Sequence, residues 1–267
     1  MGSATIITVF NHKGGVGKTT TSVNLAAALC LGYGVRCLVV DMDPQANATR
    51  SLLAKETALI QPTMGNTLSD AGAGNATIQS IAVSTSVPGL RLAPSALCLS
   101  EAEFKLTARN RREFILRERL CPVADGYDYI IIDCAPSLGL LTLNALVAAQ
   151  GVIVPCETQF LSLRGLRYVL DVLELIRTRL NPGLKVLGVL PTKFYVLSTA
   201  NNEALACMRR LNTVRVFNAV IPRDVKAEEA PSHGTPVVAY APESRAAREY
   251  RTFTAEVKHL CQQENQN

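Results

Sequence analysis

The feature that most constrains this sequence is the glycine-rich stretch FNHKGGVGKTT, which joins a short β-branched run to a helical pattern. The run ATIITVF at 4–10 is typical of a buried strand, and 18–31 is typical of a helix. The stretch between them matches the phosphate-binding pattern G-x-x-x-x-G-K-[ST], except that His12 replaces the first glycine and an additional lysine, Lys13, follows it. A strand, such a loop and a helix in immediate succession predict an anion site at the end of the first strand of an α/β fold.

The chemistry of this loop points to a nucleotide with a metal ion. Backbone N–H groups freed by glycine wrap an anion, and the positive end of the following helix adds to the attraction. We expect the Lys18 ammonium to reach the β- and γ-phosphates and the Thr19 hydroxyl to bind Mg²⁺. A glycine-rich turn that binds nothing is disfavoured, because strand, glycines, lysine, threonine and helix are all in register. The residues expected to hold the nucleotide in this loop are Gly14, Gly15, Val16, Gly17, Lys18, Thr19 and Thr20.

Short apolar runs alternate with helical patterns along the rest of the chain. The run YDYIIID at 127–133 is apolar on both faces, as a central parallel strand requires. Further strands are expected at 35–41, 89–95, 151–155 and 184–191, and further helices at 137–149, 161–178 and 200–210. This alternation predicts the α/β class, a P-loop NTPase with a mostly parallel, twisted β-sheet and helices on both faces. We expect one domain over 1–267, with an irregular excursion at 57–86 and a flexible polar tail at about 262–267.

Three aspartates are expected at the carboxyl edge of the sheet, beside the loop. Asp133 ends the run YIIID, where its carboxylate can hold Mg²⁺ through water. Asp41 and Asp43 lie two residues apart in VVDMDPQANAT and so point the same way in an extended chain. One is expected to steady the metal shell and the other to orient or deprotonate the attacking water. We place Thr19, Asp41 and Asp133 at the metal. A turn opened by Asp-x-Asp-Pro is the alternative interpretation of the pair.

Composition narrows the cellular setting. The eight cysteines are scattered and form no C-x-x-C pair, which favours reduced thiols in a cytoplasmic protein. No apolar run approaches the ~18 residues that a membrane-spanning helix needs. The segment 245–263 is charged throughout and reads as lacking a strong apolar face, which argues against an amphipathic membrane anchor. The net charge of +5 is compatible with an anionic partner but does not require one.

Four stretches together carry a family resemblance: KGGVGKTT, DMDPQANAT, YDYIIIDCAPSLG and IPRDVKAEEAPSHGTPV. They resemble the ParA/Soj family of DNA-partitioning ATPases, within the larger group with a deviant Walker A motif that also includes MinD. The likeness runs from about residue 5 to about residue 257, nearly the whole chain. It implies ATP and Mg²⁺ as cofactors and a slow, Mg-dependent hydrolysis of ATP to ADP and phosphate.

The resemblance also implies roles for particular residues. Lys13 matches the family's signature lysine, which reaches across an ATP-sandwich dimer to the partner's phosphates, as an arginine finger does in trans. Lys18 matches the Walker A lysine, Asp43 the water-positioning acid and Asp133 the Walker B acid. The catalytic set is then Lys13, Lys18 and Asp43, and Pro222 and Arg223 match the segment that contacts the adenine. The alternative for Lys13 is that it is solvated or pairs with a neighbouring carboxylate.

A basic surface for DNA is the least specific expectation. In the family such a surface forms on dimerisation and binds DNA without sequence preference, and Lys226 matches a basic position implicated in it. Neutralising phosphates needs only lysines and arginines that converge on one face. The candidates are Arg209, Arg210, Lys226, Arg245 and Arg248. A solvated, salt-bridged surface is the competing interpretation, because glutamates are interspersed among these residues.

The sequence departs from the family pattern at several positions. Leu197 stands where an arginine is common, so one usual DNA contact is expected to be missing or relocated. Glu157 and Gln159 stand where a glutamine and an acidic residue are usual, which we expect to alter the dimer face. No N-terminal extension precedes the first strand, so a helix-turn-helix repressor module is not expected. We interpret His12 as a packing residue.

The leading functional hypothesis is a cytoplasmic, ATP-driven switch that associates with the nucleoid. With ATP the chain would dimerise and bind non-specific DNA, and a ParB-like or cargo-adaptor partner would stimulate hydrolysis and release, segregating a plasmid or chromosome. The same mechanism could position a protein cargo, such as a carboxysome or a chemoreceptor array. A MinD-like membrane cycler is disfavoured by the charged C-terminal segment. A metabolic enzyme with a bridging metal cluster is disfavoured because Cys121, Cys134 and Cys156 do not fall in the expected pattern.

Overall fold

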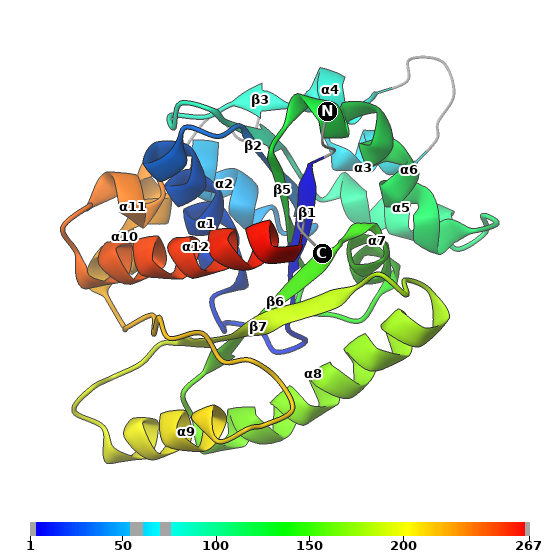
Figure 1. The fold of residues 1–267 in the computed structure, drawn as a ribbon. Helices are drawn as coiled ribbons and strands as arrows, with labels where there is room; N and C mark the ends of the chain where they lie inside the picture. The colour runs from blue at the N-terminus through cyan, green and yellow to red at the C-terminus, as the bar shows by residue number, and fades with distance from the viewer. Residues whose placement is uncertain (1–3, 54–60, 70–75, 265–267) are drawn as a thin grey trace.

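A computed structural model describes residues 4–53, 61–69 and 76–264 of the chain. Within them, one seven-stranded sheet has the order β3-β4-β2-β5-β1-β6-β7 (Figure 1). Every neighbouring pair is parallel except β3 with β4, which is antiparallel. The strands are β1 (Thr5–Val9), β2 (Cys37–Met42), β3 (Val83–Ser84), β4 (Leu90–Ala93), β5 (Tyr129–Cys134), β6 (Gly151–Glu157) and β7 (Lys185–Thr192). The predicted α/β class with a mostly parallel sheet is confirmed.

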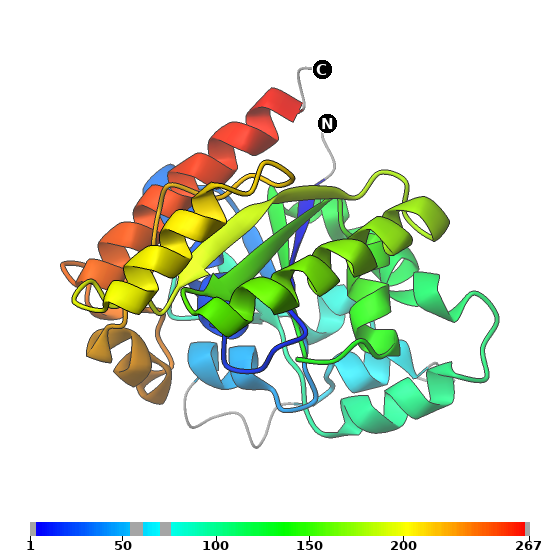
Figure 2. The same ribbon diagram turned by 90° about the horizontal axis from the view of Figure 1, so that it is seen from below.

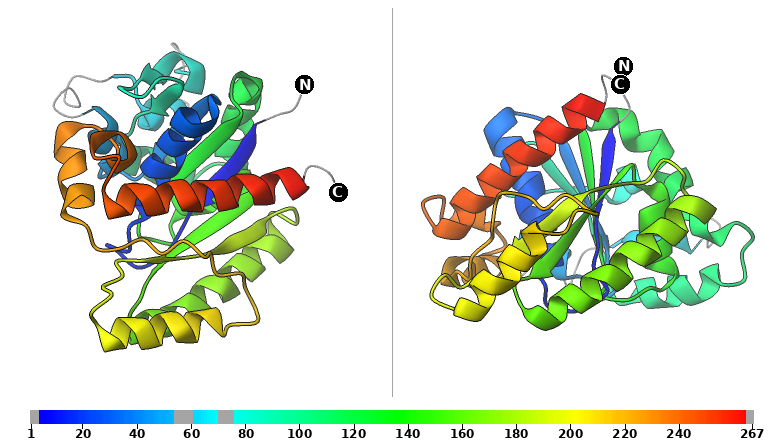
Figure 3. Two further views of the ribbon diagram at one scale, coloured as in Figure 1. Left: turned by 60° about the vertical axis from the view of Figure 1, so that its left-hand side comes forward. Right: turned by 60° about the horizontal axis from the view of Figure 1, so that its bottom comes forward.

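Helices cover both faces of this sheet. In chain order they are α1 (Lys18–Tyr33), α2 (Asn47–Leu53), α3 (Met64–Leu68), α4 (Ile78–Ile81), α5 (Cys98–Leu106), η2 (Arg112–Phe114), α6 (Ile115–Leu120), η3 (Cys121–Gly126), α7 (Leu140–Ala148), α8 (Phe160–Arg179), α9 (Thr199–Arg209), α10 (Val225–Glu229), η4 (Ala230–His233), α11 (Val237–Tyr240) and α12 (Arg245–Glu264). The helices form an apolar core with each face of the sheet. On one face the core contains α1, α11 and α12, and on the other it contains α5, α6, α7 and α8. Figures 2 and 3 show α12 and α8 on opposite sides of the sheet.

The central strands bury both of their faces, which explains their unbroken apolar sequence. Successive residues of β5, Ile130 and Ile131, are fully buried in opposite cores. Each such side chain contributes about 1.5–3 kcal/mol when it leaves water. The register pairs Asp41 of β2 with Asp133 of β5, and Asp133 with Val9 at the end of β1. Rigid packing of these strands therefore fixes both acids next to the loop that follows β1.

The expectation that 245–263 lacks an apolar face is wrong. Residues of α12 spaced three and four apart are buried in the core that it shares with α1: Ala246, Tyr250, Phe253, Val257 and Cys261. The charged residues between them occupy the other side of the helix, so overall composition conceals a regular apolar stripe. This stripe is covered by the protein itself, and α1 and α12 lie in contact.

The excursion expected at 57–86 and the tail expected at about 262–267 contain more regular structure than the sequence indicates. Part of the excursion at 57–86 lies outside the described residues, but the described part contains α3, α4 and β3, with Met64, Leu68 and Ile78 buried. Residues 265–267 of the predicted flexible tail also lie outside the described residues, whereas α12 extends to Glu264. None of the helices that the structure describes combines the length and the apolar character needed to cross a membrane.

Candidate nucleotide-binding site

The loop between β1 and α1 has the backbone that the glycine pattern predicts. Gly15 and Gly17 adopt left-handed conformations, with φ of 75° and 89°, which side chains rarely tolerate. Gly17 is the N-cap of α1 and offers no side chain to the first turn. The N–H groups at the start of this 16-residue helix are therefore left for an anion, at the positive end of the helix dipole.

Lys18 lies inside the loop rather than outside it. The residue is 6% exposed, and its Nζ donates a hydrogen bond to the carbonyl oxygen of Lys13 at 2.9 Å. Burial lowers the pKa of Lys18, although the charges of Asp133, Cys134 and Asp43 oppose this shift. A buried ammonium held by one carbonyl lacks a full counter-charge, so a phosphate entering the loop would stabilise it.

Asp133 and Thr19 form the pair that the metal expectation requires. The Thr19 hydroxyl donates to Oδ2 of Asp133 at 2.8 Å, and the Ser22 hydroxyl donates to Oδ1 at 2.8 Å. Burial raises the pKa of Asp133 to about 6, against the lowering effect of both hydroxyls. Hard oxygen donors on a carboxylate and a hydroxyl are what Mg²⁺ prefers, so this pair fits the ion and would hold it.

The structure separates the two acids of DMDPQ. Asp43 lines the cleft beside the loop, and its Oδ1 accepts the N–H of Gln45 at 2.9 Å. Asp41 is fully buried, and its Oδ2 accepts both the N–H and the hydroxyl of Thr49 at 2.8 and 2.7 Å. Its Oδ1 accepts the N–H of Asp43 at 3.1 Å. Burial, followed by the charge of Asp133, raises the pKa of Asp41 to about 7.

These contacts give the two acids different chemistry. Asp43 presents a carboxylate to the cleft, which suits its predicted role at the attacking water. Asp41 faces no such space, because its oxygens are used by the chain. We therefore interpret Asp41 as the residue that positions Asp43, in place of the direct metal contact expected for it.

The cleft around the loop has a volume of about 910 Å³. Besides the loop and Asp43, the residues that line it are Gln45, Asn47, Arg50, Ser51, Cys134, Pro136, Lys193, Ala227, Glu228, Pro231 and Ser232. Pro222 and Arg223 do not line it; they pair with the segment after β7, where the Arg223 N–H donates to the Phe194 carbonyl at 2.9 Å. Their contact with adenine stays a prediction.

Lys193 was missed by sequence reasoning. It follows β7, adopts a left-handed conformation with φ of 52°, and its Nζ lies 3.9 Å from the place that a Cβ on Gly15 would take. A non-glycine residue in this conformation is uncommon and often marks a functional site. The one signal available from sequence was a lysine directly after a buried strand, at the edge where ligands bind.

Lys13 and Lys193 share one carboxylate. The Nζ of Lys13 lies 2.7 Å from Oε2 of Glu157, and the Nζ of Lys193 lies 3.4 Å from Oε1. Burial raises the pKa of Glu157, but the hydrogen bond and charge of Lys13 and the charge of Lys193 outweigh burial and hold this pKa below its usual range. The Lys13 side chain is 43% exposed, so it is accessible from outside while it is paired. The pairing that was weighed as an alternative for Lys13 is present in this monomer.

His12 serves as a packing residue, as interpreted from the sequence. Its ring contacts Tyr168 edge-on, with 5.2 Å between the ring centroids. Its Cε1 lies 3.3 Å from the place that a Cβ on Gly165 would take, so the imidazole is pressed against α8.

The candidate DNA residues come from three elements. Arg209 and Arg210 lie at the end of α9, Lys226 lies in α10, and Arg245 and Arg248 lie in the first turn of α12. All five are exposed. Lys226 is paired with Glu229 at 2.8 Å, but an exposed pair of this kind is worth at most about 1 kcal/mol and leaves the ammonium able to exchange partners.

A phosphate loop at the carboxyl edge of a mostly parallel sheet, with a buried acid beside its threonine, defines a P-loop ATPase. A family model described as an AAA domain matches residues 4–186. The sporulation initiation inhibitor protein Soj of Bacillus subtilis is 42% identical over 253 residues, covering 94% of this chain and 97% of Soj. The chromosome partitioning protein ParA of Myxococcus xanthus is 40% identical, covering 94% of this chain and 87% of that protein. The chain belongs to the ParA/Soj family of partitioning ATPases.

A solved structure supports the same fold and the nucleotide. A cobyrinic acid a,c-diamide synthase from Mycobacterium smegmatis, solved with ADP and magnesium and with an ATP analogue and magnesium, has a TM-score of 0.81. It is 33% identical, and the match covers 94% of this chain and 93% of that one. The predicted ATPase activity and the cofactors ATP and Mg²⁺ are thereby supported, and the donor set of the loop, Thr19 and Asp133 fits them.

Proposed function

We propose that this chain is a DNA-partitioning switch driven by ATP. In the presence of ATP and Mg²⁺ two copies close face to face, and the dimer binds DNA without sequence preference on the nucleoid in the cytoplasm. A ParB-like partner stimulates hydrolysis, the dimer opens and the DNA is released. Cycles of binding and release then segregate a plasmid or chromosome.

The observation that carries the proposal is the different placement of two lysines in one loop. Lys18 is buried and directed into the loop, where it meets the Lys13 carbonyl. Lys13 is partly exposed, and its ammonium is bound to Glu157 on β6 instead. One ammonium therefore serves the phosphates of its own subunit. The other remains accessible to a second subunit, where two anionic nucleotides facing each other need additional positive charge.

The remaining residues of the site supply the hydrolytic part of the cycle. ATP supplies the bond that is broken, and Mg²⁺ neutralises developing charge on the phosphates. Asp43 lines the cleft; its Oδ1 accepts the Gln45 N–H at 2.9 Å, and its Oδ2 accepts a longer hydrogen bond of 3.4 Å from the Asn47 amide, which also lines the cleft. A fixed carboxylate at this place can orient a water molecule and accept its proton. The chain thus carries its own acid for slow hydrolysis, and a partner can accelerate it.

The exposed arginines and Lys226 would supply the contact with DNA. Their scatter over α9, α10 and α12 suits binding to phosphates rather than bases, because base reading needs side chains grouped on one element that enters a groove. Two copies double the positive charge, so binding should depend on dimerisation and fall steeply with salt.

The decisive experiment uses Asp43→Ala, which should hold the ATP state, and a random-sequence DNA duplex. Binding is measured with ATP and with ADP at two salt concentrations. Binding only with ATP, weakened by salt, supports the switch. Absence of binding in both states, in a protein that still binds ATP, would remove DNA from the function and leave the nucleotide site standing. Adding a DNA-bound partner from the same genetic neighbourhood then separates a plasmid or chromosome from a protein cargo.

A further inference from the structure

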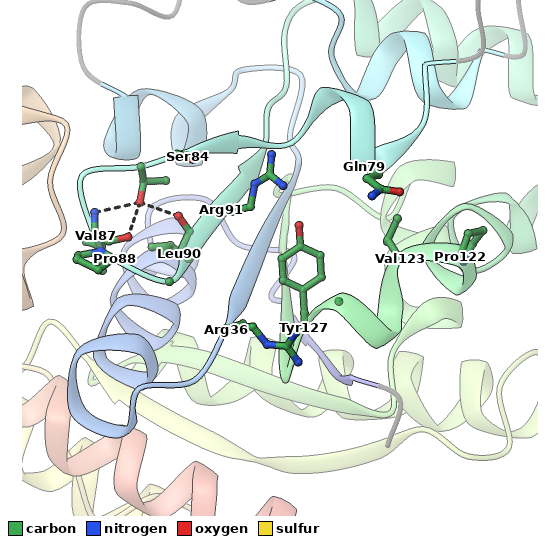
Figure 4. A pocket seen from close by; sticks show the side chains of 13 residues that line it. Arg36, Gln79, Ser84, Val87, Pro88, Leu90, Arg91, Pro122, Val123 and Tyr127 are labelled. Atoms are coloured by element: carbon green, nitrogen blue, oxygen red, sulfur yellow. Dashed lines mark hydrogen bonds between the residues drawn. The ribbon is translucent and has the colours of Figure 1, made fainter. Parts of the chain in front are cut away.

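A second cleft lies at the opposite edge of the sheet from the nucleotide site. It has a volume of about 550 Å³ and is formed by the residues that precede or begin β2, β4 and β5, together with α4 and η3 (Figure 4). Nucleotides and substrates of α/β sheets bind outside the carboxyl ends of the strands, whereas this cleft lies at the amino ends. It is therefore separate from the cleft of Asp43 and Lys18.

Arg91 is the polar residue that is hardest to explain as part of the core. In the sheet it is paired with Leu38 of β2, which is paired in turn with Ile130 of β5. Side chains in register on neighbouring parallel strands point to the same face, and both of these neighbours are fully buried apolar residues. The guanidinium therefore belongs to a row that is apolar toward the centre of the sheet and ends at Ser84 of β3 on its other side.

The guanidinium of Arg91 leaves part of its donor set unused. One terminal nitrogen donates to the carbonyl of Ala82, at the end of α4, while Nε is buried without a hydrogen-bond partner. Among the described residues, no carboxylate forms an ion pair with Arg91. A buried donor without a partner is destabilising, and more so when it is charged. An anion in the adjacent cleft would compensate the charge of this guanidinium.

The other polar groups of the cleft agree with a single negative charge. Arg36 also lines it, but it has a carboxylate of its own: Asp128 accepts hydrogen bonds from its guanidinium and from its backbone N–H, whereas Arg91 has no such partner among the described residues. Tyr127 and Gln79 offer a hydroxyl and an amide, and Figure 4 shows the Tyr127 hydroxyl directed toward the side of the cleft where Arg91 lies. One uncompensated cation with neutral hydrogen-bonding groups beside it matches a monoanion.

The rest of the lining is mixed, with Ser84 and Thr85 as polar members and a larger apolar part. The apolar part is formed by Val87, Pro88, Leu90, Pro122 and Val123. Clefts of about 300–1,000 Å³ with mostly apolar walls and a few placed polar groups are typical of small-molecule sites. Of these residues Pro88 and Pro122 are exposed; a bare inorganic ion would leave them in water, whereas a molecule with an apolar body would cover them.

We propose that this cleft is a binding site for a small monoanionic molecule with an apolar body, such as an aromatic carboxylate. Its carboxylate binds the guanidinium of Arg91, and its body lies against Pro88 and Pro122. The site is independent of the nucleotide cleft, so the proposal stands whether or not the chain binds DNA.

The test uses 2-naphthoate as the probe and its uncharged amide, 2-naphthamide, as the matched neutral compound. Affinity is measured by ligand-observed NMR titration on the full chain with saturating Mg–ADP, so that the nucleotide cleft is filled. Because a hydrogen bond to a charged group is worth about 1.5–3 kcal/mol, we expect naphthoate to bind about ten- to a hundredfold more tightly than the amide. Arg91→Gln should abolish that difference, and Arg179→Gln, at an exposed arginine of α8, should preserve it.

A second variant guards against a folding defect in Arg91→Gln. Gly126 lines the cleft, and a Cβ added there meets no atom within 4 Å, so Gly126→Leu should narrow the cleft without strain. This variant should weaken naphthoate binding about tenfold or more while thermal unfolding stays as in the wild type. Absent naphthoate binding, equal binding of the two probes, or unchanged binding in Gly126→Leu would each overturn the proposal.

Discussion

The Nζ of Lys13 lies 2.7 Å from Oε2 of Glu157, although the two residues are 144 positions apart in the sequence. The contact joins the phosphate loop, which follows β1, to the end of β6. These two strands, β1 and β6, are neighbours in the sheet. It holds the signature lysine of the family against its own subunit. Any role of Lys13 across a dimer therefore requires the lysine to exchange Glu157 for a phosphate.

Replacing Lys13 tests that exchange directly. Lys13→Ala should bind ATP as the wild type does, because Lys18 occupies the loop of the same subunit, but it should not form the ATP dimer. Sedimentation velocity with ATP and Mg²⁺ measures the dimer, and Lys105→Ala, at an exposed lysine of α5, is the control. If Lys13→Ala dimerises normally, the trans role is wrong.

Replacing Glu157 should increase the amount of ATP dimer, whereas replacing Lys13 should abolish it. At neutral pH this carboxyl is ionised, because its pKa is held below the usual range, so Glu157→Gln removes a charge that retains Lys13. Since Lys13 is 43% exposed, we expect release to be worth no more than about 1 kcal/mol, a fewfold gain in dimer at limiting ATP. A loss of dimer in sedimentation would instead show that Glu157 supports the closed state.

Replacing Asp43 should separate binding from hydrolysis. Asp43→Ala should keep ATP affinity while turnover falls about a hundredfold or more, because the acid at the attacking water is removed. Phosphate release measures turnover, and Asp125→Ala, at an exposed aspartate of η3, is the control. Wild-type turnover in Asp43→Ala would exclude this residue from the mechanism.

Replacing Lys226 should reveal whether it contacts a phosphate. Lys226→Ala should weaken DNA binding, and because the dimer loses one lysine in each subunit, the slope of log K against log salt should become shallower by about two units. The assay is a salt titration of binding by the Asp43→Ala protein with ATP, with Lys105→Ala as the matched control. An unchanged slope would mean that Lys226 only pairs with Glu229.

Truncating the buried stripe of α12 should destabilise the whole domain. Phe253 is fully buried, and its ring meets Phe217 edge-on with 4.8 Å between the centroids. Phe253→Ala should lower the free energy of unfolding by about 3–5 kcal/mol, measured by urea denaturation. Thr252→Ala, on the exposed side of the same helix, should change it by less than about 0.5 kcal/mol. Equal effects would mean that α12 is not part of the core.

Local sequence was enough to predict the parts of the site that are continuous in the chain. Strand, loop and helix follow one another from Thr5 to Tyr33, and the backbone of Gly15 and Gly17 is set by local sterics, so the phosphate loop could be predicted before any contact was known. The four family motifs allowed Asp43 and Asp133 to be predicted as residues of the same site. The apolar runs predicted the parallel sheet for the same reason, since a strand buried on both faces must be apolar throughout.

The rest depended on the order of the strands. Lys13, Glu157 and Lys193 meet only because β1, β6 and β7 are neighbours, and Asp41 is closed off only because Thr49 lies over it. Arg91 lies beside Leu38 because β2 pairs with β4, and the apolar stripe of α12 is buried because α1 packs against it. Such contacts join residues far apart in the chain. Their energy comes from burial and pairing rather than from local conformation, so no short stretch of sequence encodes them.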